Sequence, residues 1–152
     1  MSYDIRLCDP VTHETINLPS AHVMTGGTYR AVIDESGRWI PEPITEAWLN
    51  VTYNYADYYH KVFEPVYRPE HPEATDERYK EFGYKVGYLY GIRSIYGMTG
   101  AESIPVLKRA VEQLGDETDP DYWKPTEGNA KKPLLQLIAM AKLRPDGVWD
   151  GD

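Results

Sequence analysis

The chain has 152 residues, of which 41% are hydrophobic and 26% charged, a normal globular mixture that argues against disorder throughout. Its net charge of −8 disfavours direct binding to nucleic acid, because an acidic surface repels phosphate backbones. A single cysteine, Cys8, allows no internal disulfide and is expected to be buried. Since neither a membrane-length apolar stretch nor a secretion signal is evident, we expect one cytoplasmic domain over residues 1–152.

Four short segments in the first third of the chain are typical of strands. Residues 3–7 alternate apolar and polar side chains, and residues 14–18 are predicted to pair with them across a proline-containing turn. Residues 28–33 form a third predicted strand. Residues 38–43 contain two prolines, which cannot donate ladder hydrogen bonds, so an edge strand or a loop is expected there.

The aromatic stretch 47–63 fits both the two-residue period of a strand and the period of a helix. A pair of β-branched residues and two asparagines favour a strand over 47–54. A short helix from about 55 to 64, ended by Pro65, is then expected to follow. One continuous helix is the alternative.

The middle of the chain is harder to assign. Residues 64–77 contain three prolines and several acidic residues, which predicts a flexible loop. Residues 76–90 can form a helix with Thr75 as its N-cap, and residues 92–97 a single turn or a short strand. Three glycines recur every four residues in or just after that helix, so either it breaks earlier or close packing compensates for them. They are Gly83, Gly87 and Gly91.

The last third is predicted to be helical. Ser103 is expected to cap a helix over 104–114, and Asn129 a helix over 129–143. Residues 146–152 are interpreted as an acidic, solvated tail. Strands followed by helices indicate an α+β fold, with a small antiparallel sheet from the N-terminal half packed against C-terminal helices.

Tyrosine is the most unusual feature of the composition, with 13 tyrosines against two phenylalanines. A buried tyrosine hydroxyl needs a hydrogen-bond partner, so an excess of tyrosine favours a partly wet surface such as an interface or a ligand pocket. For any single tyrosine, a place at the rim of the core is the better interpretation. For the group, we predict a binding patch that includes Tyr53, Tyr55, Tyr58, Tyr59 and Tyr96.

Charged and polar residues near these rings complete the candidate site. Asp57 lies among the tyrosines and either accepts a hydrogen bond from a ligand or, the favoured interpretation, caps a helix. Arg93 follows the second tyrosine cluster, and Lys131 and Lys132 lie near a predicted helix start, where they could meet an anion.

Two loops are also candidates. In residues 24–29, the backbone around Gly26, Gly27 and Thr28 is a weak candidate for anion binding, although a tight turn is favoured. Tyr122 and Trp123 lie in a polar connection and either contact a partner or plug the end of the helices.

No complete catalytic set is present in the sequence. The four histidines lack metal-ligand spacing, and the aspartates of 146–152 lack the pattern of a calcium loop. We predict no catalytic residue, no metal site and no cofactor.

Three stretches, residues 47–55, 91–114 and 121–152, give the chain a resemblance to an uncharacterised family of small bacteriophage and prophage proteins. Family membership transfers no site residues. It implies an accessory protein in the host-cell cytoplasm that blocks a host component or captures a host signalling molecule.

Together these observations predict a non-enzymatic binding protein. The first hypothesis is an inhibitor that blocks a host defence protein through an acidic, tyrosine-rich surface, and association with copies of itself is compatible with it. The second is a protein that sequesters a nucleotide-like small molecule in an aromatic pocket. The third is a small nucleotide-processing enzyme centred on Asp57 and His60.

Overall fold

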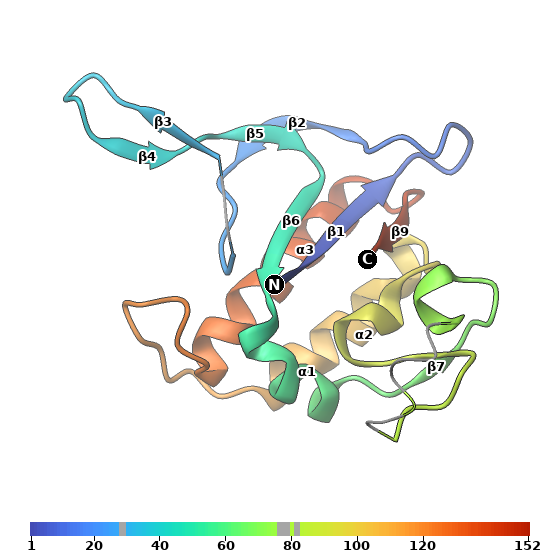
Figure 1. Cartoon of the computed structure of the whole chain (residues 1–152). Helices are drawn as coiled ribbons and strands as arrows, with labels where there is room; N and C mark the ends of the chain where they lie inside the picture. The colour runs from blue at the N-terminus through green and yellow to red at the C-terminus, as the bar shows by residue number, and fades with distance from the viewer. Residues whose placement is uncertain (28–29, 76–79, 81–82) are drawn as a thin grey trace.

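The structure, a computed structural model, describes all residues except 28–29, 76–79 and 81–82. It confirms the α+β fold: a three-stranded antiparallel sheet lies against two long helices (Figure 1). The sheet has the order β6-β1-β9, and its strands are β1 (Ser2–Cys8), β6 (Trp48–Thr52) and β9 (Val148–Gly151). The helices are α1 (Ala56–Val62), α2 (Gly100–Gln113) and α3 (Glu127–Leu143).

The core forms between this sheet and the helices. The alternation predicted for β1 is confirmed, since Tyr3, Ile5 and Leu7 are all buried on one face. Cys8, at the end of β1, is a free and buried thiol, as predicted. Trp149 of β9 is fully buried, and its indole N–H donates to the hydroxyl of Ser103 in α2 at 2.7 Å.

The prediction of a solvated tail at 146–152 is wrong. Residues Val148–Gly151 form β9, which pairs with β1 and places Cys8 opposite Val148. The sequence did not predict this strand, because its acidic residues are typical of an exposed tail and its one large apolar side chain is Trp149.

The predicted hairpin between 3–7 and 14–18 is formed only in part. A single bridge joins Cys8 and Thr15, and the chain then leaves β1. The strand that follows, β2 (Asn17–His22), pairs with β5 (Ile44–Glu46). The partner of β1 is instead β6, over a register that runs from Ser2 opposite Thr52 to Arg6 opposite Trp48.

The strand-then-helix interpretation of 47–63 is confirmed. After β6, the 3₁₀ turn η1 (Tyr53–Tyr55) leads into α1, and the Thr52 hydroxyl caps it by accepting from the Asn54 N–H.

The helix predicted at 76–90 is wrong over residues 83–90. Residues 83–87 make turns, and the short strand β8 (Tyr88–Leu89) pairs with β7 (Val66–Tyr67). The two glycines inside this segment, Gly83 and Gly87, have φ of 81° and 95°, a conformation that the interior of a right-handed helix excludes. The rest of the predicted helix, 76–79 and 81–82, lies outside the described residues.

The neighbouring segments are short turns. Thr75 ends the 3₁₀ turn η2 (Pro72–Thr75), and its hydroxyl donates to the Pro72 carbonyl at 2.8 Å. The turn predicted at 92–97 is the 3₁₀ turn η4 (Gly91–Ile95).

Both long helices begin before their predicted caps. Thr99 caps α2 through a capping box with Glu102, so Ser103 lies inside the helix, where its hydroxyl donates to the Gly100 carbonyl. Thr126 caps α3 and accepts from the N–H of Asn129, so the predicted Asn129 cap is also wrong.

A two-stranded arm projects from the body (Figure 1). It consists of β3 (Ala31–Ile33) and β4 (Trp39–Pro41), which pair with each other. The predicted strand 28–33 is therefore seen from Ala31 onward, and residues 38–43 contain an edge strand, as predicted.

Candidate functional site

The tyrosines around α1 hold a loop in place. Four side chains from residues 54–59 donate hydrogen bonds to backbone carbonyls between α2 and α3 or in the first turn of α3. The pairs are Asn54 with Trp123, Tyr55 with Tyr122, Tyr58 with Pro125, and Tyr59 with Ala130. Carbonyls of an irregular connection would otherwise lack partners, and these donors supply them.

Two of these tyrosines belong to the core. Tyr55 and Tyr59 are fully buried. Burial, and to a lesser extent Tyr122 and Asp121, raises the pKa of Tyr55 to about 12. Burial also raises the pKa of Tyr59 well above its usual value. Both hydroxyls therefore stay protonated as donors near neutral pH, and a wet rim of the core does not describe them.

The Asn129 side chain fixes the same loop from the other side. Its amide N–H groups donate to the carbonyls of Asp119, Asp121 and Lys124 at 3.1–3.3 Å, and its oxygen accepts from the Asp119 N–H. The sequence interpretation missed this role. A buried asparagine one turn after a helix cap is the signal that could have revealed it, because such a side chain needs several partners.

A pocket opens between this loop, the start of α3 and the loop at residues 24–27. Its volume is about 160 Å³. Residues that line it include Gly26, Gly27, Tyr55, Tyr122, Asn129 and Lys132. The fold thus brings together the glycine loop, two candidate aromatic residues and one of the candidate lysines.

The two glycines allow the 24–27 loop to press against its neighbours. A Cβ atom on Gly26, whose φ is +90°, would lie 2.5 Å from the ring of Pro133 in α3. A Cβ atom on Gly27 would lie 2.1 Å from the Asn50 carbonyl oxygen in β6. The Gly26 carbonyl accepts from the Thr52 N–H at 2.8 Å, which fixes the loop to the sheet. The third residue of this candidate, Thr28, lies outside the described residues.

The pocket carries unused hydrogen-bond donors and a positive charge. In the ranges that the structure describes, the backbone N–H groups of Gly26 and Gly27 donate to no acceptor. Over the same ranges, the Lys132 ammonium makes no ion pair, whereas its neighbour Lys131 lies 2.5 Å from the Asp116 carboxylate. These groups suit an anion.

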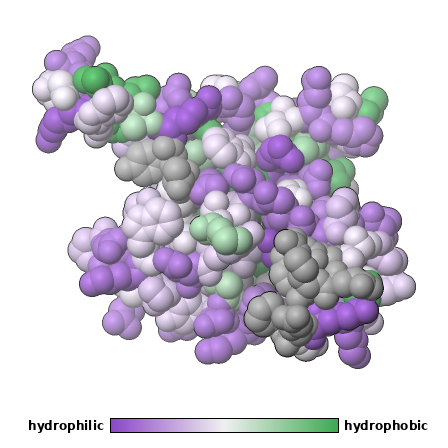
Figure 2. All heavy atoms as spheres, in the orientation of Figure 1, coloured by the Kyte–Doolittle hydropathy of each residue, from purple (hydrophilic) through white to green (hydrophobic). Residues whose placement is uncertain are grey.

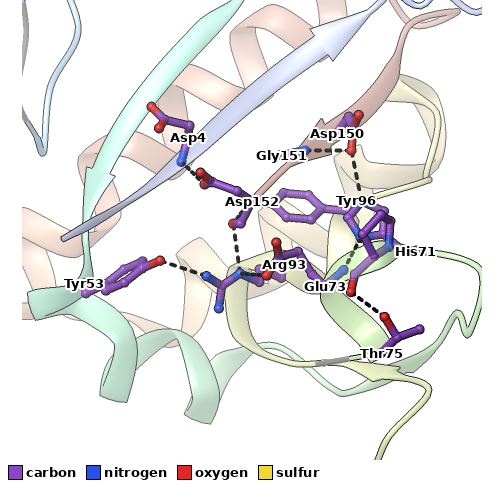
Figure 3. A network of polar contacts seen from close by, with 11 residues as sticks. Asp4, Tyr53, His71, Glu73, Thr75, Arg93, Tyr96, Asp150, Gly151 and Asp152 are labelled. Atoms are coloured by element: carbon purple, nitrogen blue, oxygen red, sulfur yellow. Dashed lines mark hydrogen bonds and ion pairs between the residues drawn. The ribbon is translucent and has the colours of Figure 1, made fainter. Parts of the chain in front are cut away.

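Three other predicted site residues serve the fold (Figure 3). The Arg93 guanidinium lies 4.8 Å from the Tyr3 ring centroid and donates to the Tyr53 hydroxyl at 2.9 Å. It also donates to the Asp152 carbonyl at 2.9 Å, and the Tyr96 hydroxyl donates to the same oxygen at 3.1 Å. This network joins β1, η4 and the residue after β9, and none of its members lines the pocket.

Asp57 and Trp123 are exposed. Asp57 lies in the first turn of α1, but Tyr55 occupies the cap position and no side chain caps that helix, so the favoured interpretation of Asp57 as a cap is wrong. Trp123 is 41% exposed, and its ring centroid lies 4.7 Å from that of Tyr122, which lines the pocket. Tyr122 and Trp123 are therefore presented by the loop and do not plug the helices.

The described residues form neither a metal-ligand cluster nor a membrane-spanning helix. No group of three or more histidine, cysteine, aspartate or glutamate side chains there could hold a metal ion. None of the helices in that part of the chain has the length and apolar character needed to span a bilayer.

Comparisons with known proteins returned no match among family models, curated proteins or solved structures. The resemblance to small phage proteins therefore stays a prediction, and the site rests on its own geometry.

Proposed function

We propose that the protein is a non-enzymatic binding protein that holds a small phosphorylated molecule in the pocket between the 24–27 loop and α3. The observation that carries this proposal is one juxtaposition: Lys132 and the two glycines of the 24–27 loop line the same pocket beside Tyr122. Lysine binds phosphate as a point charge, and backbone N–H groups add direction to that attraction.

The polar groups of the pocket divide into those already used and those available. The Tyr55 hydroxyl donates to the Tyr122 carbonyl, and the Asn129 amide is bonded to the 119–124 loop. The Gly26 and Gly27 N–H groups and Lys132 are not used in this way within the described chain. The available groups are donors and a cation, which select a negatively charged ligand.

The size and the aromatic wall suggest what else the ligand carries. A pocket of about 160 Å³ is smaller than the ~300 Å³ at which sites for drug-sized ligands begin, so it can enclose only one end of a nucleotide-sized molecule. Tyr122 and Trp123 lie side by side where the rest of the ligand would emerge. Base-aromatic stacking there contributes about 1–3 kcal/mol and favours a planar group.

Binding without turnover is supported by the composition of the pocket lining. Among the described lining residues there is no carboxylate and no histidine that could move a proton. Asp57 and His60, on which the enzyme hypothesis is centred, do not line this pocket.

The proposal is tested by calorimetric titration with AMP, adenosine and inorganic phosphate. We expect AMP to bind, adenosine to bind more weakly, and Lys132→Gln to weaken AMP binding about tenfold, as expected for losing roughly 1.4 kcal/mol of a charge-assisted contact. Lys131→Gln is the matched control, because it removes the same charge one residue away, where Asp116 already pairs with it. Equal AMP affinity in both variants, or no binding of AMP or phosphate at millimolar concentration, would rule the site out.

A host protein blocked through an acidic, tyrosine-rich surface stays a prediction with less support. Tyr55, Tyr59 and Tyr96 are buried, so they offer no such surface. This hypothesis draws on the acidic segments 70–77, 116–121 and 146–152. The described part of the first, 70–75, and the second lie on opposite sides of the body (Figure 1).

A further inference from the structure

The projecting arm exposes apolar side chains on both of its faces. Ile33 lies opposite Trp39 on one face, and these side chains are 59% and 70% exposed. Val32 lies opposite Ile40 on the other face, and Ile40 is 37% exposed. Figure 2 shows hydrophobic residues gathered on this arm. A two-stranded hairpin is marginally stable by itself, so apolar residues on both faces call for a cover.

The hydrogen-bond alternation of the arm tells which backbone groups point outward. The Glu42 N–H donates to the Arg30 carbonyl at 2.7 Å, and the Asp34 N–H donates to the Arg38 carbonyl at 2.9 Å. These are therefore hydrogen-bonded pairs of the antiparallel ladder. Because such pairs alternate along a strand, Val32, midway between them on β3, also directs its N–H and C=O toward β4.

Within the described residues, β4 is the one strand that pairs with β3, so the outer edge of β3 has no partner there. Ala31 and Ile33 direct their N–H and C=O groups away from β4. On β4, the residue opposite Ala31 is Pro41, which has no N–H to offer. Pro41 therefore makes the β4 edge a poor site for the addition of another strand. The β3 edge contains no proline and lacks this protection.

We propose that two copies of this chain pair antiparallel along β3, with Val32 on the two-fold axis. In this register, Ala31 and Ile33 of one copy face the partner's Ile33 and Ala31 and exchange four backbone hydrogen bonds. Two arms then form a four-stranded sheet whose apolar stripes continue across the axis on both faces. The interface is isologous, so it closes at two copies.

Charge complementarity supports this register. Arg30 falls opposite the partner's Asp34, and the same pair recurs across the axis. A shift of two residues would instead place Arg30 or Asp34 opposite the partner's Val32. Arg30 also lies 3.2 Å from Glu42 within its own chain, so the cross-copy pair selects the register more than it adds affinity.

Repulsion between two acidic chains is small at this surface. Residues 30–42 carry two arginines and three acidic residues, a net charge of −1, whereas the whole chain carries −8. The projection of the arm also holds the two acidic bodies apart, and screening acts beyond about 8–10 Å.

The first test is sedimentation equilibrium of the full chain over a range of concentrations. We expect a mass that rises to twice the 17.4 kDa of one chain, with micromolar dissociation because the ladder is short. Ile33→Pro removes an outward N–H without touching the ladder to β4, so it should weaken the dimer at least tenfold. A wild-type chain that stays monomeric at several hundred micromolar, or an Ile33→Pro dimer of unchanged affinity, would overturn the proposal.

A cross-linking test covers the case in which Ile33→Pro disturbs the arm itself. Val32 and the partner's Val32 would form a non-hydrogen-bonded pair with Cα atoms about 4.5 Å apart, within disulfide range. Under mild oxidation Val32→Cys should therefore form a covalent dimer. Ile40→Cys is the matched control, because it lies on the same face but one strand further from the axis. Equal cross-linking of both variants would reject the proposed register.

Discussion

The segment at 53–59 and the arm at 31–41 are both rich in large apolar or aromatic side chains, yet the fold treats them in opposite ways. Around α1, Tyr55 and Tyr59 are fully buried and their hydroxyls find carbonyl partners. On the arm, Trp39 and Ile33 remain mostly exposed, and β3 and β4 pack mainly on each other.

This difference shows that the density of aromatic residues is a poor guide to a binding surface. A tyrosine cluster beside an irregular connection can serve as a set of hydrogen-bond donors for that connection. Exposed apolar groups whose outer strand edge is unpaired point to a partner more directly, because water solvates their surface at a free-energy cost.

The contrast between the α1 region and the arm can be tested first by replacing one aromatic residue in each with alanine. Tyr59→Ala should lower the free energy of unfolding by about 3–5 kcal/mol, because it leaves a cavity and removes the hydrogen bond from the Tyr59 hydroxyl to the Ala130 carbonyl. Trp39→Ala should change it by less than about 0.5 kcal/mol in dilute, monomeric protein. Urea unfolding at low concentration measures both. Comparable losses would mean that the arm packs as firmly as α1 does.

A smaller effect is expected from the side chain that organises the pocket loop. Asn129→Ala should destabilise the fold by about 1–3 kcal/mol, since three carbonyls and one N–H lose a buried partner. Asn54→Ala, which removes one exposed hydrogen bond to the same loop, is the control and should lose less than about 1 kcal/mol. If the two variants melt alike, Asn129 does not hold the loop.

The smallest expected effect is a pH dependence at the end of α1. Burial lowers the pKa of His60 below its usual 6.5, against the opposing influence of Asp57. The unfolded chain therefore binds this proton at higher pH than the folded chain does. Stability from His60 is full above pH 6.5 and is lost as the pH falls toward the folded pKa.

Melting temperatures measured between pH 7.5 and pH 5 check this prediction. His60→Gln should flatten the decline in that window, while His13→Asn on the exposed first turn should leave it unchanged. Identical slopes for wild type and His60→Gln would show that another group causes the decline.

Much of the fold could be predicted from local pattern. The alternation in β1, the strand-then-helix division of 47–63 and the α+β class all follow from residue period and propensity. The helix expected at 76–90 failed at 83–90 because Gly83 and Gly87 have positive φ, and the caps of α2 and α3 fell on threonines a few residues earlier.

The candidate site was predictable only in pieces. Gly26, Tyr55 and Tyr122 were each identified from sequence, but nothing local indicates that they share one pocket. Arg93 and Tyr96, which were predicted for the same patch as Tyr55, do not line that pocket. Such contacts join residues that are tens of positions apart in the chain, and composition does not encode which of them meet.

By itself, the sequence determined the class of fold, the identity of most strands and helices, and the supply of tyrosine donors, because these depend on neighbours along the chain. The tertiary structure decided which tyrosines became core, that residues 148–151 complete the sheet, and that Lys132 lines the same pocket as the glycine loop. It also left the β3 edge uncovered. Burial and hydrogen-bond pairing depend on packing between distant segments, and they decide whether a side chain stabilises the fold or remains free to bind.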